Sequence, residues 1–200
     1  MLLNPHWNPD VLYHQTAPVD GVFDITGLDL TGYQRVALYM DGITATGAVD
    51  LVMHTYIDGG LRAVEGHVWR ASAGTTANGD GSFESSVGTG FGVYVSNSVD
   101  LGSGAGQAFS GCLELSVPPA KYPSFSLDAY AIASSGVGVR YTAAGHLTDT
   151  GRLTGFALVA QNGGLLSGGT ITVYAMKKAL GRAPDPITAA VQSLWTGDVA

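Results

Sequence analysis

The shortest stretch of this sequence that could support chemistry is EGHVW, residues 65 to 69. In a β-strand, successive side chains alternate between the two faces, so Glu65, His67 and Trp69 would share one face. A carboxylate, an imidazole and an indole on one face are suited to a sugar, because an aromatic ring stacks on the apolar face of a sugar while polar groups bind its hydroxyls. Together with a second histidine they would also suit a metal ion.

The strand before EGHVW is predicted to supply the second half of such a site. In VDLVMHTYI, residues 49 to 57, the alternation places His54, Tyr56 and then Asp58 on the face opposite an apolar row. The sequence Asp58-Gly59-Gly60 indicates a hairpin turn, with the segment 63–69 as the returning strand. That hairpin would bring the two polar sets together.

Three interpretations of this arrangement stay open. It is a glycan contact or protein interface made by Tyr56, Glu65, His67 and Trp69; or a metal or catalytic site; or an outer sheet face with ordinary cross-strand polar pairs. Paired carboxylates for glycoside hydrolysis need a set separation that spacing alone does not give. We therefore expect no catalytic residue, no metal and no cofactor, and we treat the four named residues as glycan or interface candidates.

Motifs for other chemistry are missing or incomplete. The sequence contains no G-x-S-x-G, H-E-x-x-H or phosphate-binding G-x-x-x-x-G-K-[ST]. The stretch TANGDGS, 76–82, lacks the position-12 glutamate of a calcium loop. The single cysteine, Cys112, excludes an intrachain disulfide, and its place in GCLELSV predicts a buried, inert thiol.

Composition favours strands over helices. Charged residues make up 12%, about half the usual share, and there are only three Glu and three Lys, the residues that coat exposed helices. Glycine, with 29 residues, is about twice as frequent as usual. The net charge of −7 makes nucleic acid an unsuitable partner, and no apolar run approaches the roughly 20 residues of a membrane helix.

The middle of the chain alternates short strands with turns. Nine or ten strands separated by connections too short for crossover helices predict an antiparallel β-sandwich or jelly roll over 21–180. The Gly/Ser-rich stretch 71–90 is predicted as a long loop with one short strand. The predicted strands are 33–40, 49–57, 63–69, 91–96, 111–117, 124–134, 136–145, 154–161 and 168–177.

Both ends differ from the middle and carry apolar residues. Residues 1–20 contain two Asn-Pro steps and predict an extended arm, whereas 181–200 predicts a short helix with one apolar face. An apolar helix this short is marginal alone, so it needs a surface. Either the ends cover their own sandwich, or they are attachment and assembly segments, for which the candidates are Trp7, Leu12, Tyr13, Ile187, Val191, Leu194 and Trp195.

Two segments resemble parts of known proteins. The stretch FDITGLDLTGYQRVALYMDGITATGAVDLVMHTYIDGG and the ending LTGFALVAQNGGLLSGGTITVYAMKK are similar to the opening and closing segments of phage and prophage virion proteins. The resemblance spans roughly 21–178, but only its two ends are distinctive, and no catalytic residue comes with them. Where those proteins close on LYG, this chain has VYAMKKAL, so its exit into the C-terminal segment differs.

The resemblance implies a non-enzymatic, jelly-roll structural component of a phage or phage-like virion: a fibre, spike or decoration protein. Such proteins are displayed on the virion surface, form homo-oligomers (most often trimers), dock on other virion proteins and touch host surface polysaccharide. The opening residues lack a signal peptide, so we expect assembly in the host cytoplasm, without membrane insertion. The alternatives are a carbohydrate-binding module and, more remotely, a polysaccharide-degrading enzyme on a β scaffold.

Overall fold

The computed structural model describes residues 9–46, 50–62, 67–75, 81–88, 91–94, 107–117, 122–132, 136–161 and 163–177, with the backbone alone for 62 and for 67–94. Within these ranges every regular element is a strand. The strands are β1 Asp10–Gln15, β2 Phe23–Ile25, β3 Tyr33–Ala45, β4 Leu51–Ile57, β5 Gly60–Arg62, β6 His67–Thr75, β7 Gly81–Gly88, β8 Phe91–Tyr94, β9 Phe109–Ser116, β10 Ser124–Ile132, β11 Gly138–Leu147, β12 Leu153–Ala160 and β13 Leu166–Lys177.

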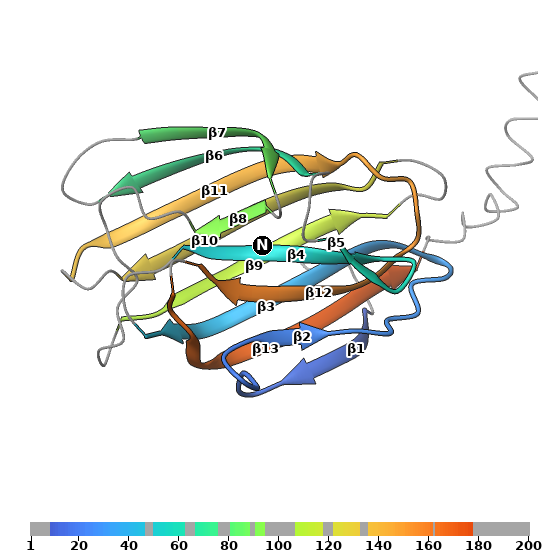
Figure 1. The fold of residues 1–200 in the computed structure, drawn as a ribbon, viewed down its shortest axis with the longest axis horizontal. Coiled ribbons are helices and arrows are strands. Elements are labelled where there is room, and N and C mark those ends of the chain that lie inside the picture. Colours follow the sequence, from blue (N-terminus) through green and yellow to red (C-terminus); the bar gives the residue numbers. More distant parts are fainter. Residues whose placement is uncertain are drawn as a thin grey trace, which may run out of the picture.

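The strands form two antiparallel sheets that pack as a β-sandwich. The large sheet has eight strands in the order β1-β13-β3-β9-β10-β11-β6-β7, and the small sheet has the order β2-β12-β4-β5, with β8 also paired to β4. Figure 1 shows β2, β12 and β4 in front of the large sheet, whose edge strands β1 and β7 lie at opposite margins of the view. The predicted all-β, antiparallel class is confirmed.

Strand pairing is nested along the chain. β3 pairs with β13, β4 with β12 and β6 with β11, so early strands meet late ones in reverse order. The innermost pair, β9 with β10, remains in the large sheet and joins β3 to β11. Each sheet is therefore completed by residues from both halves of the chain.

The alternation seen in the sequence decides which face is buried. In β13, Ile171, Val173 and Ala175 are at most 1% exposed, and β10 alternates between exposed and buried without a break. The inner faces of the two sheets form one core, which also includes large side chains such as Phe23, Tyr141 and Phe156. Removing apolar surface from water stabilises the fold by about 25 cal/mol per Å².

The structure differs from the predicted strands in three places. Residues 10–15 and 23–25 form strands that were not predicted. The stretch 71–90, predicted mainly as loop, contains the end of β6 and all of β7, which pair with each other at the margin of the large sheet. The long-loop prediction is wrong because small polar residues still pair through their backbones in a hairpin.

The predicted terminal segments fall largely outside the described residues. Residues 1–8 and 178–200, including Trp7, Ile187, Val191, Leu194 and Trp195, lie there, as does the predicted C-terminal helix. The second half of the N-terminal arm is described, and its residues 10–15 are the edge strand β1. No helix long and apolar enough to cross a membrane occurs in the ranges that the structure describes.

Candidate functional site

The predicted Asp58–Gly59 hairpin forms, but it does not assemble the predicted site. Asp58 and Gly59 both have positive φ, and the strand that returns from them is β5, only three residues long. The next strand, β6, joins the large sheet, where the backbone of His67 is paired with Leu147 and that of Trp69 with Gly145. For the described residues 67–69 the prediction of a return beside β4 is therefore wrong, and residues 63–66 lie outside the described ranges.

The three glycan or interface candidates that the structure describes are accordingly distributed between two sheets. Tyr56 lies in the small sheet, while His67 and Trp69 lie in β6 of the large sheet, where only the backbone is described. Glu65 is outside the described residues. A strand's alternation shows which residues share a face, but it does not show which sheet the strand joins, and glycan binding by these residues stays a prediction.

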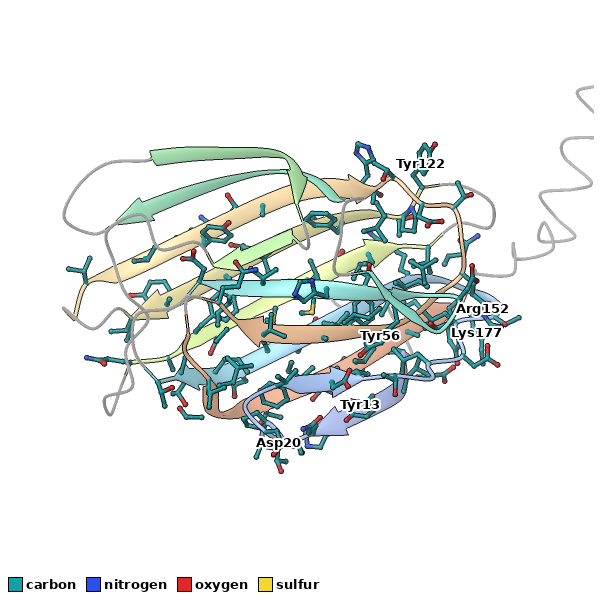
Figure 2. All side chains as sticks on the ribbon, in the orientation of Figure 1. Tyr13, Asp20, Tyr56, Tyr122, Arg152 and Lys177 are labelled. Carbon is teal, nitrogen blue, oxygen red and sulfur yellow. The ribbon has the colours of Figure 1, made fainter. Side chains whose placement is uncertain are left out.

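Tyr56 has a structural role in the small sheet. Its hydroxyl donates a hydrogen bond to Oδ1 of Asp24 at 2.7 Å, and the side chain spans β12, which separates β4 from β2. Burial, followed by the hydrogen bond and charge of Asp24, raises the pKa of Tyr56 to about 12. Figure 2 shows Tyr56 on the small sheet, where its phenol ties the edge strand β2 to the sheet's centre.

Two of the predicted assembly residues contribute to the domain itself. Leu12 and Tyr13 are partly buried and pack against the core, because β1 continues the large sheet beside β13. Tyr13 also donates a hydrogen bond to Gln15 Oε1 at 2.7 Å, and Figure 2 shows it at the β1 margin. For these two, packing on the parent domain is observed, and a role in assembly stays a prediction.

The outer face of the large sheet carries a hollow that the sequence did not predict. It has a volume of about 310 Å³ and is lined by Pro9, Ala37, Tyr39, Tyr174 and Met176. Ala37 and Tyr174 are directly opposite each other on β3 and β13, and the small Ala37 is only 3% exposed. The hollow therefore has an alanine at its base between larger apolar and aromatic side chains.

The two tyrosine rings give the hollow a defined shape. Tyr39 and Tyr174 meet edge to face, with ring centroids 5.3 Å apart and planes at 88°, an arrangement favoured by the ring quadrupoles. Tyr39 remains 43% exposed, so it offers aromatic surface to a partner. Burial, and then the neighbouring Cys112, raise the pKa of Tyr39 above its ordinary value of 10.0.

Cys112 lies opposite Tyr39 on β9, on the outer face. The thiol is half-buried rather than buried as predicted, because outward side chains of this sheet are only partly covered. Desolvation raises the pKa of the thiol, which keeps it protonated and weakly nucleophilic.

A polar cluster lies at the end of the sheet where β1 begins and β13 ends. Tyr33 donates a hydrogen bond to Oδ2 of Asp10 at 2.6 Å, and Nζ of Lys177 lies 3.0 Å from the same oxygen. The ammonium group is also 5.4 Å from the centre of the Tyr33 ring. Asp10 thus links β1 to both β3 and β13, immediately beside the hollow residues Pro9 and Met176.

The other ionic contacts of the outer face join neighbouring strands. Arg140 on β11 donates two hydrogen bonds to the carboxylate of Asp128 on β10, and Arg35 on β3 lies 3.4 Å from Glu114 on β9. Exposed pairs of this kind contribute little to stability, because solvent screens the two charges. They do pair the charges of Arg35, Glu114, Asp128 and Arg140 on the described part of this face.

The described part of the chain shows no group of three or more His, Cys, Asp or Glu side chains placed to hold a metal ion. The described geometry does include an apolar, aromatic hollow on an exposed sheet face. Part of this hollow could be seen in the sequence, because Tyr39 and Tyr174 lie on the outward-facing rows of their strands. It did not show that β3 and β13, far apart in the chain, are neighbours.

Comparison of the chain with protein-family models, with curated proteins and with solved structures finds no match.

Proposed function

We propose that this protein is a non-enzymatic, self-assembling structural component of a phage or phage-like virion, of the fibre, spike or decoration type. The proposal combines the sequence resemblance over 21–178 with a sandwich whose nested strand pairs are of the kind found in jelly rolls. On this proposal the protein is a homo-oligomer, most simply a trimer, on the virion surface. Other virion proteins are its neighbours.

The observation that carries the proposal is the outer face of the large sheet. Its described part combines small and hydroxyl side chains, locally paired charges and exposed aromatic residues, of which Tyr130 is 50% and Tyr39 43% exposed. Exposed aromatic residues among few free charges are typical of protein interfaces. Such a face suits contact with identical copies.

The direct test is the molar mass of the full chain in solution, measured by light scattering over a range of concentrations. We expect a closed oligomer, with a trimer at three times the 20.5 kDa of the chain. A monomer at every concentration would contradict self-assembly.

The aromatic hollow also favours a second candidate, a carbohydrate-binding module, because tyrosine rings can stack on sugars. This alternative predicts saturable binding to a bacterial surface polysaccharide that Tyr174→Ala abolishes. The earlier sequence hypothesis predicts instead that Trp69→Ala abolishes it. Assaying both variants against one polysaccharide panel separates the two locations, and absence of binding by the wild-type chain excludes both.

A further inference from the structure

The hollow lies where the described chain begins and ends. Pro9, the first described residue, and Met176, the residue before the end of β13, both line it. After Lys177 the chain continues for residues 178–200, including the one segment for which the sequence predicts an apolar helical face. Receptor and candidate occupant are therefore connected through the end of a single strand.

The predicted helix matches the hollow in chemistry. Its apolar residues recur at i, i+3, i+4, i+7 and i+8, and are Ile187, Ala190, Val191, Leu194 and Trp195. A helix placed in an apolar groove is held through this spacing. The hollow provides two tyrosines and a methionine, whose ring edges and thioether make favourable contacts with an indole.

Charge does not oppose this match. The segment 187–195 carries no charged side chain, and Arg182, Asp185 and Asp198 flank it. Arg35, which is directly opposite Met176 on β3, has a side chain 58% exposed at the border of the hollow. Arg35 is paired with Glu114, which is opposite Ala37 on β9, so the uncharged segment 187–195 meets a compensated ion pair at this border.

The connection after β13 is long enough for the segment 187–195 to reach a hollow. Residues 178–186 form a connection of nine residues that spans at most about 30 Å when extended. This reach lets the segment enter the hollow of its own copy or that of a neighbouring copy, and it is donation to the next copy around a ring that produces self-assembly. A head-to-tail contact of this kind closes if the rotation between copies allows it.

We propose that the hollow formed by Pro9, Ala37, Tyr39, Tyr174 and Met176 is the receptor for the C-terminal segment 187–195 of a second copy of this chain. The inference rests on the proposed self-assembling function and names the contact that would produce it. The donated segment covers the exposed aromatic surface of the receiving copy, and the short helix gains the surface that it needs to form.

The test mixes two full-chain variants that are defective in opposite halves of the contact. Leu194→Ala combined with Trp195→Ala removes the donor and leaves the hollow intact. Met176→Glu places a charge in the hollow and leaves the donor intact. We expect each variant alone to be a monomer, and an equimolar mixture to form a species of twice the 20.5 kDa chain mass, because one functional contact remains and cannot propagate.

Two matched controls accompany the test. Gln192→Ala lies off the predicted apolar face, and Tyr130→Ala removes an exposed aromatic residue of the same sheet face away from the hollow. Both should keep the wild-type molar mass. Circular dichroism and the thermal midpoint establish that every variant is folded, and Tyr174→Ser is a second receptor variant if Met176→Glu fails to fold.

The outcomes that overturn the inference are distinct from failure of the proposed function. A monomeric wild-type chain contradicts the function itself. A wild-type oligomer that persists in the donor variant overturns only the docking inference, and so does a mixture that stays monomeric. Saccharide binding lost in Tyr174→Ser while the oligomer stays intact assigns the hollow to a sugar instead.

Discussion

At the scale of single residues, Gly155 shows how closely the small sheet is packed around Tyr56. A Cβ atom at position 155 would lie 2.2 Å from the carbonyl oxygen of Ile25 and 3.1 Å from Cδ2 of Tyr56. The glycine allows β2 to approach β12 and leaves room for the tyrosine ring to pass. A larger residue at position 155 would push β2 away from β12 and displace the ring of Tyr56.

We therefore expect Gly155→Ala to lower the free energy of unfolding by about 1–3 kcal/mol, the usual cost of overpacking. Urea unfolding measures it. Gly60→Ala is the matched control, because the nearest atom to its Cβ is 3.6 Å away, and it should change stability by less than about 0.5 kcal/mol. Equal stability of the two variants would show that β2 does not pack as described.

Asp10 makes the stability of the sheet end depend on pH. The hydrogen bond from Tyr33, followed by that from Lys177, lowers the pKa of this carboxyl below its ordinary value of 3.8. A lowered pKa stabilises the fold at pH values above the ordinary one, and the contribution is lost as the pH falls through the lowered pKa.

The Asp10→Asn variant should therefore be less stable than wild type at pH 6, with the difference shrinking as the pH falls below about 3.8. Urea midpoints of the two proteins between pH 6 and pH 2.5 give this difference. Lys177→Gln should reduce the difference without removing it, because the hydrogen bond from Tyr33 remains. A stability difference that does not change with pH would show that ionisation of the Asp10 carboxyl does not cause it.

At the scale of elements, the β4–β5 hairpin could be predicted and its sequel could not. The sequence Asp58-Gly59-Gly60 indicates a tight turn, and the structure has positive φ at 58 and 59. The returning strand is nevertheless three residues long, and the chain then enters the other sheet. Local turn chemistry is encoded locally, whereas the choice of sheet depends on partners such as β11, about 80 residues away.

Gly59 tests the hairpin directly. Its φ is +81°, and nothing lies within 4 Å of a Cβ placed there, so substitution strains only the backbone. We expect Gly59→Ala to cost about 1–2 kcal/mol in thermal or urea unfolding. Leu61→Ala changes an exposed side chain of the same hairpin and should lower the free energy of unfolding by less than about 0.5 kcal/mol. A larger loss of stability in Leu61→Ala would contradict the exposure of this side chain.

The rows of core residues were the most predictable elements. Alternation puts Val36, Leu38 and Met40 on one face of β3, and the structure shows that this face and the row Ile171, Val173 and Ala175 of β13 are buried. The candidate site was far less predictable, because the hollow depends on Tyr39 and Tyr174 being brought together by a long-range pairing. Alternation determines faces, and only the folded topology determines neighbours.

At the scale of the whole molecule, individual strands should differ in local stability. β10 is bonded along its length to both β9 and β11, whereas β1 pairs only with β13 among the described strands, and β2 is three residues long. Backbone amides open most rarely where many contacts must break together.

Hydrogen exchange followed by mass spectrometry should therefore find the slowest exchange in β9, β10 and β11 and the fastest in β1 and β2. Addition of excess full-chain protein to dilute samples should slow exchange in β1 if copies assemble over the adjoining hollow. Uniform protection from β1 to β11 would contradict this gradient.

The nested pairing also has a consequence for synthesis of the chain. A ribosome makes β1 before the other described strands, yet its partner β13 is the last of them to be made, and β3 also waits for β13. The nascent chain must therefore carry exposed edges at β1 and β3 until β13 has been made. β13 then pairs with both strands at once. Pairs such as β4–β5, β6–β7, β3–β9 and the β9–β10–β11 meander can form earlier, whereas β1 and one edge of β3 wait for β13, a delay that favours chains kept apart from one another.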